Sequence, residues 1–125
     1  MTLEEIGQTI EAEVLTGQDR LRDEVAVGCA ADLMSDVLAF ARSDAILLTG
    51  LANRQVIYTA DVAGISAVCI IRGKKPDQPT VELARQKGQV LMTTRLPMFV
   101  CCGRLFAKGL PGLGYLDISK GDGDR

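Results

Sequence analysis

The chain has 125 residues, a formal net charge of −2, 47% hydrophobic residues and no histidine. Its length fits one domain with a self-sufficient core, and its small net charge argues against nucleic acid as a partner. The lack of histidine excludes Ser-His-Asp and Cys-His catalysis and histidine-based zinc sites. With two Tyr, three Phe and no Trp, the chain also lacks the aromatic residues that stack on single-stranded bases.

The first residues and the four cysteines of the sequence indicate in which cellular compartment the protein resides. Met1–Glu5 carries two acids and no apolar run, which is unlike a signal peptide. No apolar stretch approaches the roughly 18 residues of a membrane span. Cys29, Cys69, Cys101 and Cys102 form no CxxC pair, so we expect free thiols and a cytoplasmic location.

Charge is distributed unevenly along the sequence. Residues 1–36 carry nine acids and two bases, whereas residues 37–125 carry seven acids and twelve bases. The two parts could pair within one subunit or between two subunits. The alternative is that these charges are scattered over a solvated surface.

The first predicted elements are short. Thr2 and Glu5 have the spacing of a capping box at the start of a helix. Glu11–Leu15 and Val25–Ala30 are strand candidates. Asp32 is then expected to cap a second helix. The apolar face of that helix would comprise Leu33, Met34, Val37, Leu38 and Ala41.

The middle of the chain repeats one unit. Apolar runs predict strands at Ala45–Thr49, Ala67–Ile71 and Gln89–Thr93, whose starts are 22 residues apart. A helix pattern follows each run. Strands at a fixed spacing with helices between them predict a mainly parallel sheet. We therefore expect an α/β fold, a single-domain three-layer sandwich with βα units repeating every 22 residues.

The loops after these three strands should meet at one edge of the sheet, where open α/β sheets bind ligands. Predicted helix starts at Asn53, Pro79 and Pro97 would point backbone N–H groups toward the same space. Basic side chains and helix N-termini together favour an anion such as a phosphate, nucleotide or carboxylate. The alternative is that the bases are merely solvated. The candidate ligand-binding residues are Thr49, Gly50, Asn53, Arg54, Arg72, Gly73, Lys74, Lys75, Thr93, Thr94 and Arg95.

No loop has a phosphate-loop signature, because neither GxxxxGK[ST] nor GxGxxG occurs. Asp32 and Asp36 lie four residues apart, so they could bind a divalent metal or share a proton. As an alternative, the pair supplies a helix cap and an acid in the first helical turn. We assign no catalytic residue, no metal and no cofactor.

Cys101 and Cys102 are neighbours on a predicted helix. Adjacent helical side chains point about 100° apart, so the two thiols cannot converge on one metal. Cys102 is expected on the apolar face with Met98, Leu105 and Phe106, packed in the core. A reactive thiol stays open if the basic loops lower its pKa.

The composition changes after Gly109. We expect a domain over residues 1–110 and a C-terminal extension over residues 111–125. Tyr115–Ile118 fits a short strand or an arm that docks on a neighbour, and the apolar, glycine-rich stretch Leu110–Ile118 suggests a homodimer. Ser119–Arg125 is rich in Gly and Asp and is expected to be disordered.

Five segments of the chain resemble DRTGG-domain proteins. They are Ala31–Ala39, Leu48–Leu51, Asn53–Ile57, Val68–Pro76 and Met98–Leu105. The resemblance covers about residues 1–110, and is to small stand-alone members from anaerobic bacteria, often encoded near iron-only hydrogenase genes. The naming motif falls near Ala52–Gln55, where Asn53 stands in place of the usual Asp, Arg54 matches and the two closing glycines are missing.

This resemblance implies an α/β fold, similar also to the N-terminal domain of HPr kinase, and self-association. The family occurs as a module in some phosphate acetyltransferases and in pyrophosphatases with nucleotide-binding CBS domains, so it implies a regulatory or ligand-sensing role. Our first hypothesis is a non-enzymatic regulatory homodimer that binds a small anionic ligand. The alternative is a protein–protein adaptor for assembly or regulation of a redox enzyme such as an iron-only hydrogenase. A small enzyme using a Cys or a carboxylate is a third hypothesis.

Overall fold

The computed structural model describes residues 1–39 and 42–113, which form one five-stranded sheet in the order β1-β5-β4-β3-β2. Strands β2 to β5 are parallel, and β1 pairs antiparallel with β5. The strands are β1 (Glu13–Thr16), β2 (Val27–Ala30), β3 (Ala45–Thr49), β4 (Ala67–Ile70) and β5 (Val90–Thr93). The predicted strand or arm at Tyr115–Ile118 and the predicted disorder at Ser119–Arg125 lie outside the described residues.

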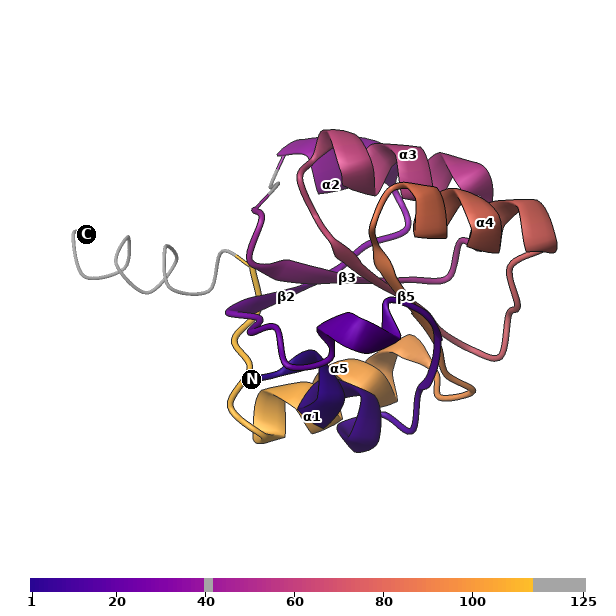
Figure 1. Ribbon diagram of the computed structural model, residues 1–125. Coiled ribbons are helices and arrows are strands. Elements are labelled where there is room, and N and C mark those ends of the chain that lie inside the picture. Colours follow the sequence, from indigo (N-terminus) through magenta and orange to yellow (C-terminus); the bar gives the residue numbers. More distant parts are fainter. Residues whose placement is uncertain (40–41, 114–125) are drawn as a thin grey trace.

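Helices cover both faces of the sheet (Figure 1). Helices α2, α3 and α4 lie on one face, and α1 and α5 lie on the other. The helices are α1 (Leu3–Thr9), α2 (Met34–Ala39), α3 (Arg54–Val62), α4 (Gln78–Gln86) and α5 (Met98–Ala107), with a short 3₁₀ turn at Gln18–Arg20. This arrangement confirms the predicted mainly parallel α/β sandwich. None of the helices in the described residues is long and apolar enough to cross a membrane.

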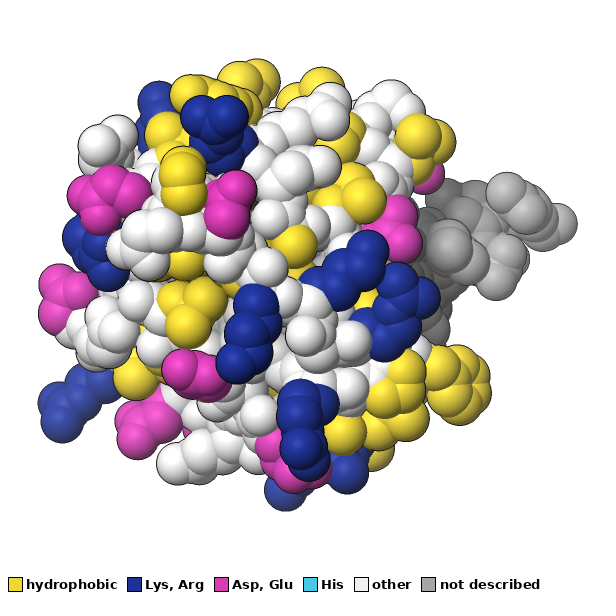
Figure 2. All heavy atoms as spheres, turned by 90° about the vertical axis from the view of Figure 1, so that its right-hand side faces the viewer, with side chains coloured by type: hydrophobic (Ala, Val, Ile, Leu, Met, Phe, Trp, Pro, Cys, Tyr) yellow, Lys and Arg dark blue, Asp and Glu magenta, His cyan; other side chains and the backbone are white. Residues whose placement is uncertain are grey.

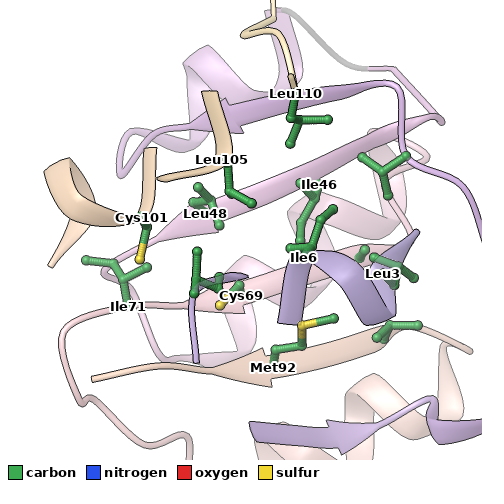
Figure 3. Close-up of a cluster of buried hydrophobic side chains, with 14 residues drawn as sticks. Leu3, Ile6, Ile46, Leu48, Cys69, Ile71, Met92, Cys101, Leu105 and Leu110 are labelled. Carbon is green, nitrogen blue, oxygen red and sulfur yellow. The ribbon is translucent and has the colours of Figure 1, made fainter. Parts of the chain in front are cut away.

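The core is divided into two layers by alternation along the central strands. Ile46 and Leu48 pack with α1 and α5, whereas Leu47 between them packs with α3. All residues of β3, β4 and β5 are buried, which explains why these strands are continuous apolar runs in the sequence. Figure 3 shows the layer beneath α1 and α5, with Cys69 and Cys101 among the buried side chains.

The repeating unit is confirmed with small shifts at its ends. β3 has its predicted bounds, β4 ends one residue early, and β5 starts one residue late at Val90. Asn53 caps α3 by accepting a hydrogen bond from the Val56 N–H, and Thr2 and Glu5 form the expected capping box. Because β3, β4 and β5 are parallel, all three strands end at the same edge of the sheet.

Two helix faces differ from the prediction. In α2 only Val37 is buried, while Leu33 and Leu38 on the predicted face are exposed. In α5 Cys101 is fully buried, Cys102 is partly buried against the same core, and Phe106 is 56% exposed. The six residues of α2 are too few for the helical period to fix one face, and Ala41 lies outside the described residues. In α5 the predicted face is confirmed at Leu105 and, in part, at Met98 and Cys102.

The described chain ends against the sheet edge. The Gly28 N–H donates to the Pro111 carbonyl at 2.9 Å, and the Leu113 N–H donates to the Gly28 carbonyl at 2.7 Å. These bonds place Pro111–Leu113 parallel to β2. The segment thus covers part of an edge strand that would otherwise expose unpaired backbone groups.

Candidate functional site

The predicted site lies where the chain changes sides of the sheet. The loop after β4 leads to α4 on one face, and the loop after β5 leads to α5 on the opposite face (Figure 1). Adjacent parallel strands whose connections diverge in this way form a topological switch point, the usual ligand-binding position in open α/β sheets. The two loops and the last residue of β5 carry seven of the candidate residues: Arg72, Gly73, Lys74, Lys75, Thr93, Thr94 and Arg95.

A left-handed turn joins these two loops. Arg72 and Gly73 both have positive φ angles, of 68° and 75°. The Arg72 N–H donates to the Leu96 carbonyl and the Gly73 N–H donates to the Thr94 carbonyl, each at 2.9 Å. The turn is therefore fixed to the loop after β5 by backbone hydrogen bonds, and it holds Arg72 at the switch point.

Basic side chains at this edge are exposed and lack acidic partners. Arg72, Lys74, Lys75 and Arg95 are exposed, and among residues 1–39 and 42–113 they form no ion pair. Figure 2 looks onto this end of the molecule and shows dark-blue basic side chains beside one another to the right of its centre. Such side chains can hold an anion without first breaking an internal ion pair.

The threonines at the strand ends divide into two kinds. The Thr49 hydroxyl donates to Asp32 at 3.0 Å and accepts from the Leu51 N–H, and the Thr94 hydroxyl donates to the Ile10 carbonyl at 2.6 Å. Both are buried and serve the fold. Thr93 is also buried, but its hydroxyl makes no hydrogen bond within the described residues.

Asn53 and Arg54 lie on the α3 side of the edge, next to the start of α4. Asp77 caps α4 by accepting hydrogen bonds from the Thr80 N–H at 2.9 Å and the Thr80 hydroxyl at 2.6 Å. These bonds, and then the positive charge of Arg54, hold the pKa of Asp77 below its usual range. Asp77 thus places one negative charge on this side, and the switch point between β4 and β5 keeps the uncompensated bases.

The start of α5 differs from those of α3 and α4. Pro97 occupies its N-cap position, and no side chain in the described part of the chain accepts a hydrogen bond from its first turn. By contrast, Asn53 and Asp77 fill this role in α3 and α4. Free N–H groups of α5 therefore adjoin the loop that bears Arg95.

One member of the acidic pair considered for metal binding, Asp32, forms hydrogen bonds with the loop after β3. Asp32 accepts hydrogen bonds from the Thr49 hydroxyl and from the Gly50 N–H at 2.7 Å, and so ties the loop after β2 to the loop after β3. Asp32, which was predicted to cap α2, thus forms a contact between two loops instead. In residues 1–39 and 42–113 no group of three or more Cys, Asp or Glu side chains could hold a metal ion.

The cysteines near this edge have suppressed acidity. Burial, followed by the neighbouring Cys101, raises the pKa of Cys69 to about 12. Burial, followed by Cys102, raises the pKa of Cys101 to about 11 despite the nearby Arg104. Burial also raises the pKa of Cys102. These directions disfavour the thiolate that a nucleophilic cysteine requires.

A cavity of about 700 Å³ lies along β2, away from the switch point. Its lining is largely apolar and comes from β2, α5 and the segment after α5, including Cys29, Cys102, Leu105, Leu110 and Leu113. Asp36 contributes a charge to it. This cavity was not predicted from the sequence, although the apolar stretch that begins at Leu110 forms one of its walls.

Comparisons with known proteins support the fold. No family model matches the chain, and no curated protein matches it. A similar solved structure has a TM-score of 0.64 and 21% sequence identity over 88% of this chain. It contains the CBS and DRTGG domains of the regulatory region of a Clostridium perfringens pyrophosphatase, complexed with the activator diadenosine tetraphosphate. The chain spans 47% of that structure, and the likeness agrees with a DRTGG-like α/β fold.

Proposed function

We propose that the chain is a non-enzymatic regulatory domain that senses a small anionic ligand, such as a nucleotide or another phosphate-containing molecule. The observation that carries this proposal is the group of basic side chains at the β4–β5 switch point that have no acidic partner among the described residues. The candidate residues at this edge provide positive charge and backbone donors but no general base. An anion bound there would join the loops that lead to helices on opposite faces of the sheet.

The fold comparison adds support for a nucleotide, since the similar pyrophosphatase region was solved with diadenosine tetraphosphate. Of the predicted residues, Arg72, Gly73, Lys74, Lys75, Thr93 and Arg95 would contact the ligand. Arg54 would add long-range attraction from the α3 side. Gly50 and Asn53 would act through the backbone and the helix cap, and Thr49 and Thr94 would keep the loops in place.

A thermal-shift screen with nucleotides, dinucleoside polyphosphates and acyl phosphates tests this proposal. A ligand at about 100 times its Kd should add roughly 2.7 kcal/mol to the unfolding free energy. Arg54→Ala and Lys74→Ala should reduce the shift. Arg85→Ala, which removes a base paired with Glu82 at 2.6 Å on the outside of α4, is the matched control. If no ligand of the panel raises the Tm, or if all three variants show the same thermal shift, the proposed site is wrong.

A second candidate function is a protein–protein adaptor, for which the apolar cavity along β2 is the supporting observation. A redox enzyme such as an iron-only hydrogenase is the partner that the family resemblance suggests. Affinity capture with the tagged chain from its native organism would test this function. Recovery of the chain alone would count against it.

Self-association is part of the first proposal. We expect a homodimer, and the domain over residues 1–110 to carry the ligand site without the extension. Light scattering coupled to size-exclusion chromatography measures the mass directly. A monomer at all concentrations would reject the dimer without affecting the ligand site.

A further inference from the structure

Two non-glycine residues in the described chain have left-handed backbones, Glu11 with φ 55° and Arg72 with φ 68°. For residues with a Cβ this conformation costs roughly 1–2 kcal/mol, so each position would accept glycine more readily. We therefore expect the side chain at such a position to make an interaction that offsets the strain. Strained residues of this kind cluster at functional sites.

The reason is visible for Glu11. Its carboxylate forms an ion pair with Arg104 at 2.7 Å, and Arg104 also donates to the Thr9 carbonyl. These contacts join the end of α1 to α5. The Glu11 side chain therefore serves a contact within the molecule, and glycine at this position would lose it.

Arg72 has the same backbone strain without such a contact. Its N–H is bonded to the Leu96 carbonyl, an interaction that glycine would make equally well. Its side chain is exposed and has no hydrogen-bond or ion-pair partner among the described residues. The following residue is already glycine, and space is open around it. The backbone thus gives no reason for arginine at position 72.

We infer that Arg72 is retained at this strained position to bind the phosphate oxygens of the ligand sensed at the β4–β5 switch point. This inference rests on the proposed function and deepens it by naming the primary contact and the ligand group. Arginine presents parallel N–H donors in a planar fork that matches two phosphate oxygens. Because the backbone on both sides of Arg72 is hydrogen-bonded to the loop after β5, its Cα is fixed before the ligand arrives.

The test separates the side chain from the backbone with two variants. Arg72→Ala removes the guanidinium and keeps the strain, whereas Arg72→Gly removes both. With tripolyphosphate as the probe, we expect both variants to bind about tenfold or more weakly in calorimetry, since a charged hydrogen bond is lost. We also expect Arg72→Gly to have the higher Tm of the two by a few degrees.

Three further measurements complete the test. Arg72→Lys keeps the charge but loses the fork, and should bind tripolyphosphate several-fold more weakly than the native chain. Citrate, a polyanion without phosphate, should bind weakly and show little difference between arginine and lysine. Arg85→Ala, which removes a base paired with Glu82 away from the switch point, should bind tripolyphosphate like the native chain.

The outcomes distinguish this inference from the proposed function. If tripolyphosphate binds, and Arg72→Ala and Arg72→Gly bind it like the native chain while Arg95→Ala does not, the inference is wrong and the anion site stands. If Arg72→Gly is less stable than Arg72→Ala, the premise of strain is wrong. If neither tripolyphosphate nor any ligand of the nucleotide panel binds, both proposals fail.

Discussion

The two ends of the sheet use their basic residues differently. At the amino end, Arg20 pairs with Asp23 at 2.9 Å and Lys87 pairs with Asp61 at 3.3 Å. At the carboxyl end, Arg72 and Arg95 have no such partner within the described residues. Arg20 and Lys87 thus stabilise contacts within the fold, whereas Arg72 and Arg95 remain accessible to a molecule from outside.

This contrast gives the small net charge a different meaning. The net charge of −2 for the whole chain does not reveal that basic side chains unpaired within the described residues lie at the carboxyl end of the strands. An anion approaching the carboxyl end meets positive charge at short range, and salt should weaken this attraction because the Debye length is only about 10 Å at 0.1 M.

The largest expected effect comes from reversing charge at the carboxyl end. Arg72→Glu combined with Arg95→Glu should weaken tripolyphosphate binding by about 100-fold or more, because two charged contacts are lost and repulsion is added. Calorimetry at low salt measures this. Both side chains are exposed, so the Tm should stay close to the native value. If the affinity for tripolyphosphate is unchanged, the bases at the carboxyl end do not bind the anion.

A second prediction concerns Cys69, which lies under the sheet face covered by α1 and α5. Its pKa is raised from 9.0 to about 12 by burial, so its stabilising contribution is complete below about pH 9 and is lost as pH rises toward 12. The slope is about 1.4 kcal/mol per pH unit. Urea unfolding at pH 7 and pH 10 should show a smaller loss for Cys69→Ala than for the native chain.

Alkylation of the cysteines tests whether the basic edge activates a thiol. Iodoacetamide should modify Cys69 and Cys101 very slowly in the folded chain at pH 7.5, and rapidly after unfolding. Fast modification of Cys101 without unfolding would reopen the hypothesis of a cysteine enzyme.

A smaller effect is expected at Asp77, the acid on the α4 side of the carboxyl end. Asp77→Asn should keep the helix cap, because Asn caps as well as Asp, and should strengthen anion binding several-fold by removing a negative charge near Arg54. Asp77→Ala should strengthen binding similarly but lower the Tm. Because the pKa of Asp77 is lowered, its contribution to stability is present above about pH 4 and decreases as pH falls further.

The smallest effect is expected at the amino end. Lys87→Gln breaks the ion pair with Asp61 and should cost about 0.2–1 kcal/mol in unfolding free energy, as is usual for exposed pairs. It should leave tripolyphosphate affinity unchanged. A loss of affinity comparable with that of Arg72→Ala would mean that anions bind without preference for one end of the sheet.

Much of the fold could be predicted because its central strands are buried on both faces. This burial requires the continuous apolar runs at Ala45–Thr49 and Ala67–Ile71, and the caps at Thr2 and Asn53 mark helix starts locally. Short elements could not be predicted as well. The six-residue α2 buries only Val37, since its position depends on neighbours rather than on its own period.

The candidate site could be predicted only in part for a related reason. Sequence order shows that Arg72 and Arg95 follow neighbouring strands, so their shared edge was predictable. The left-handed backbone of Arg72 was not, because local sequence does not reveal the hydrogen bonds to Thr94 and Leu96 that hold it. Asp32 was predicted as a cap, yet its carboxylate bonds to Gly50, a contact across 18 positions of the chain.

The contacts of Met1 and of Pro111–Leu113 have a consequence for engineering. The Met1 carbonyl accepts from the Val25 N–H at 2.8 Å, and Gly28 exchanges two hydrogen bonds with Pro111 and Leu113. Val25 and Gly28 are three residues apart, or about 10 Å of extended chain. Residues 1 and 113 are therefore anchored close together on one margin of the sheet. This geometry suits circular permutation, or insertion of residues 1–113 into a surface loop of a host protein, with the basic carboxyl end of the sheet still facing solvent.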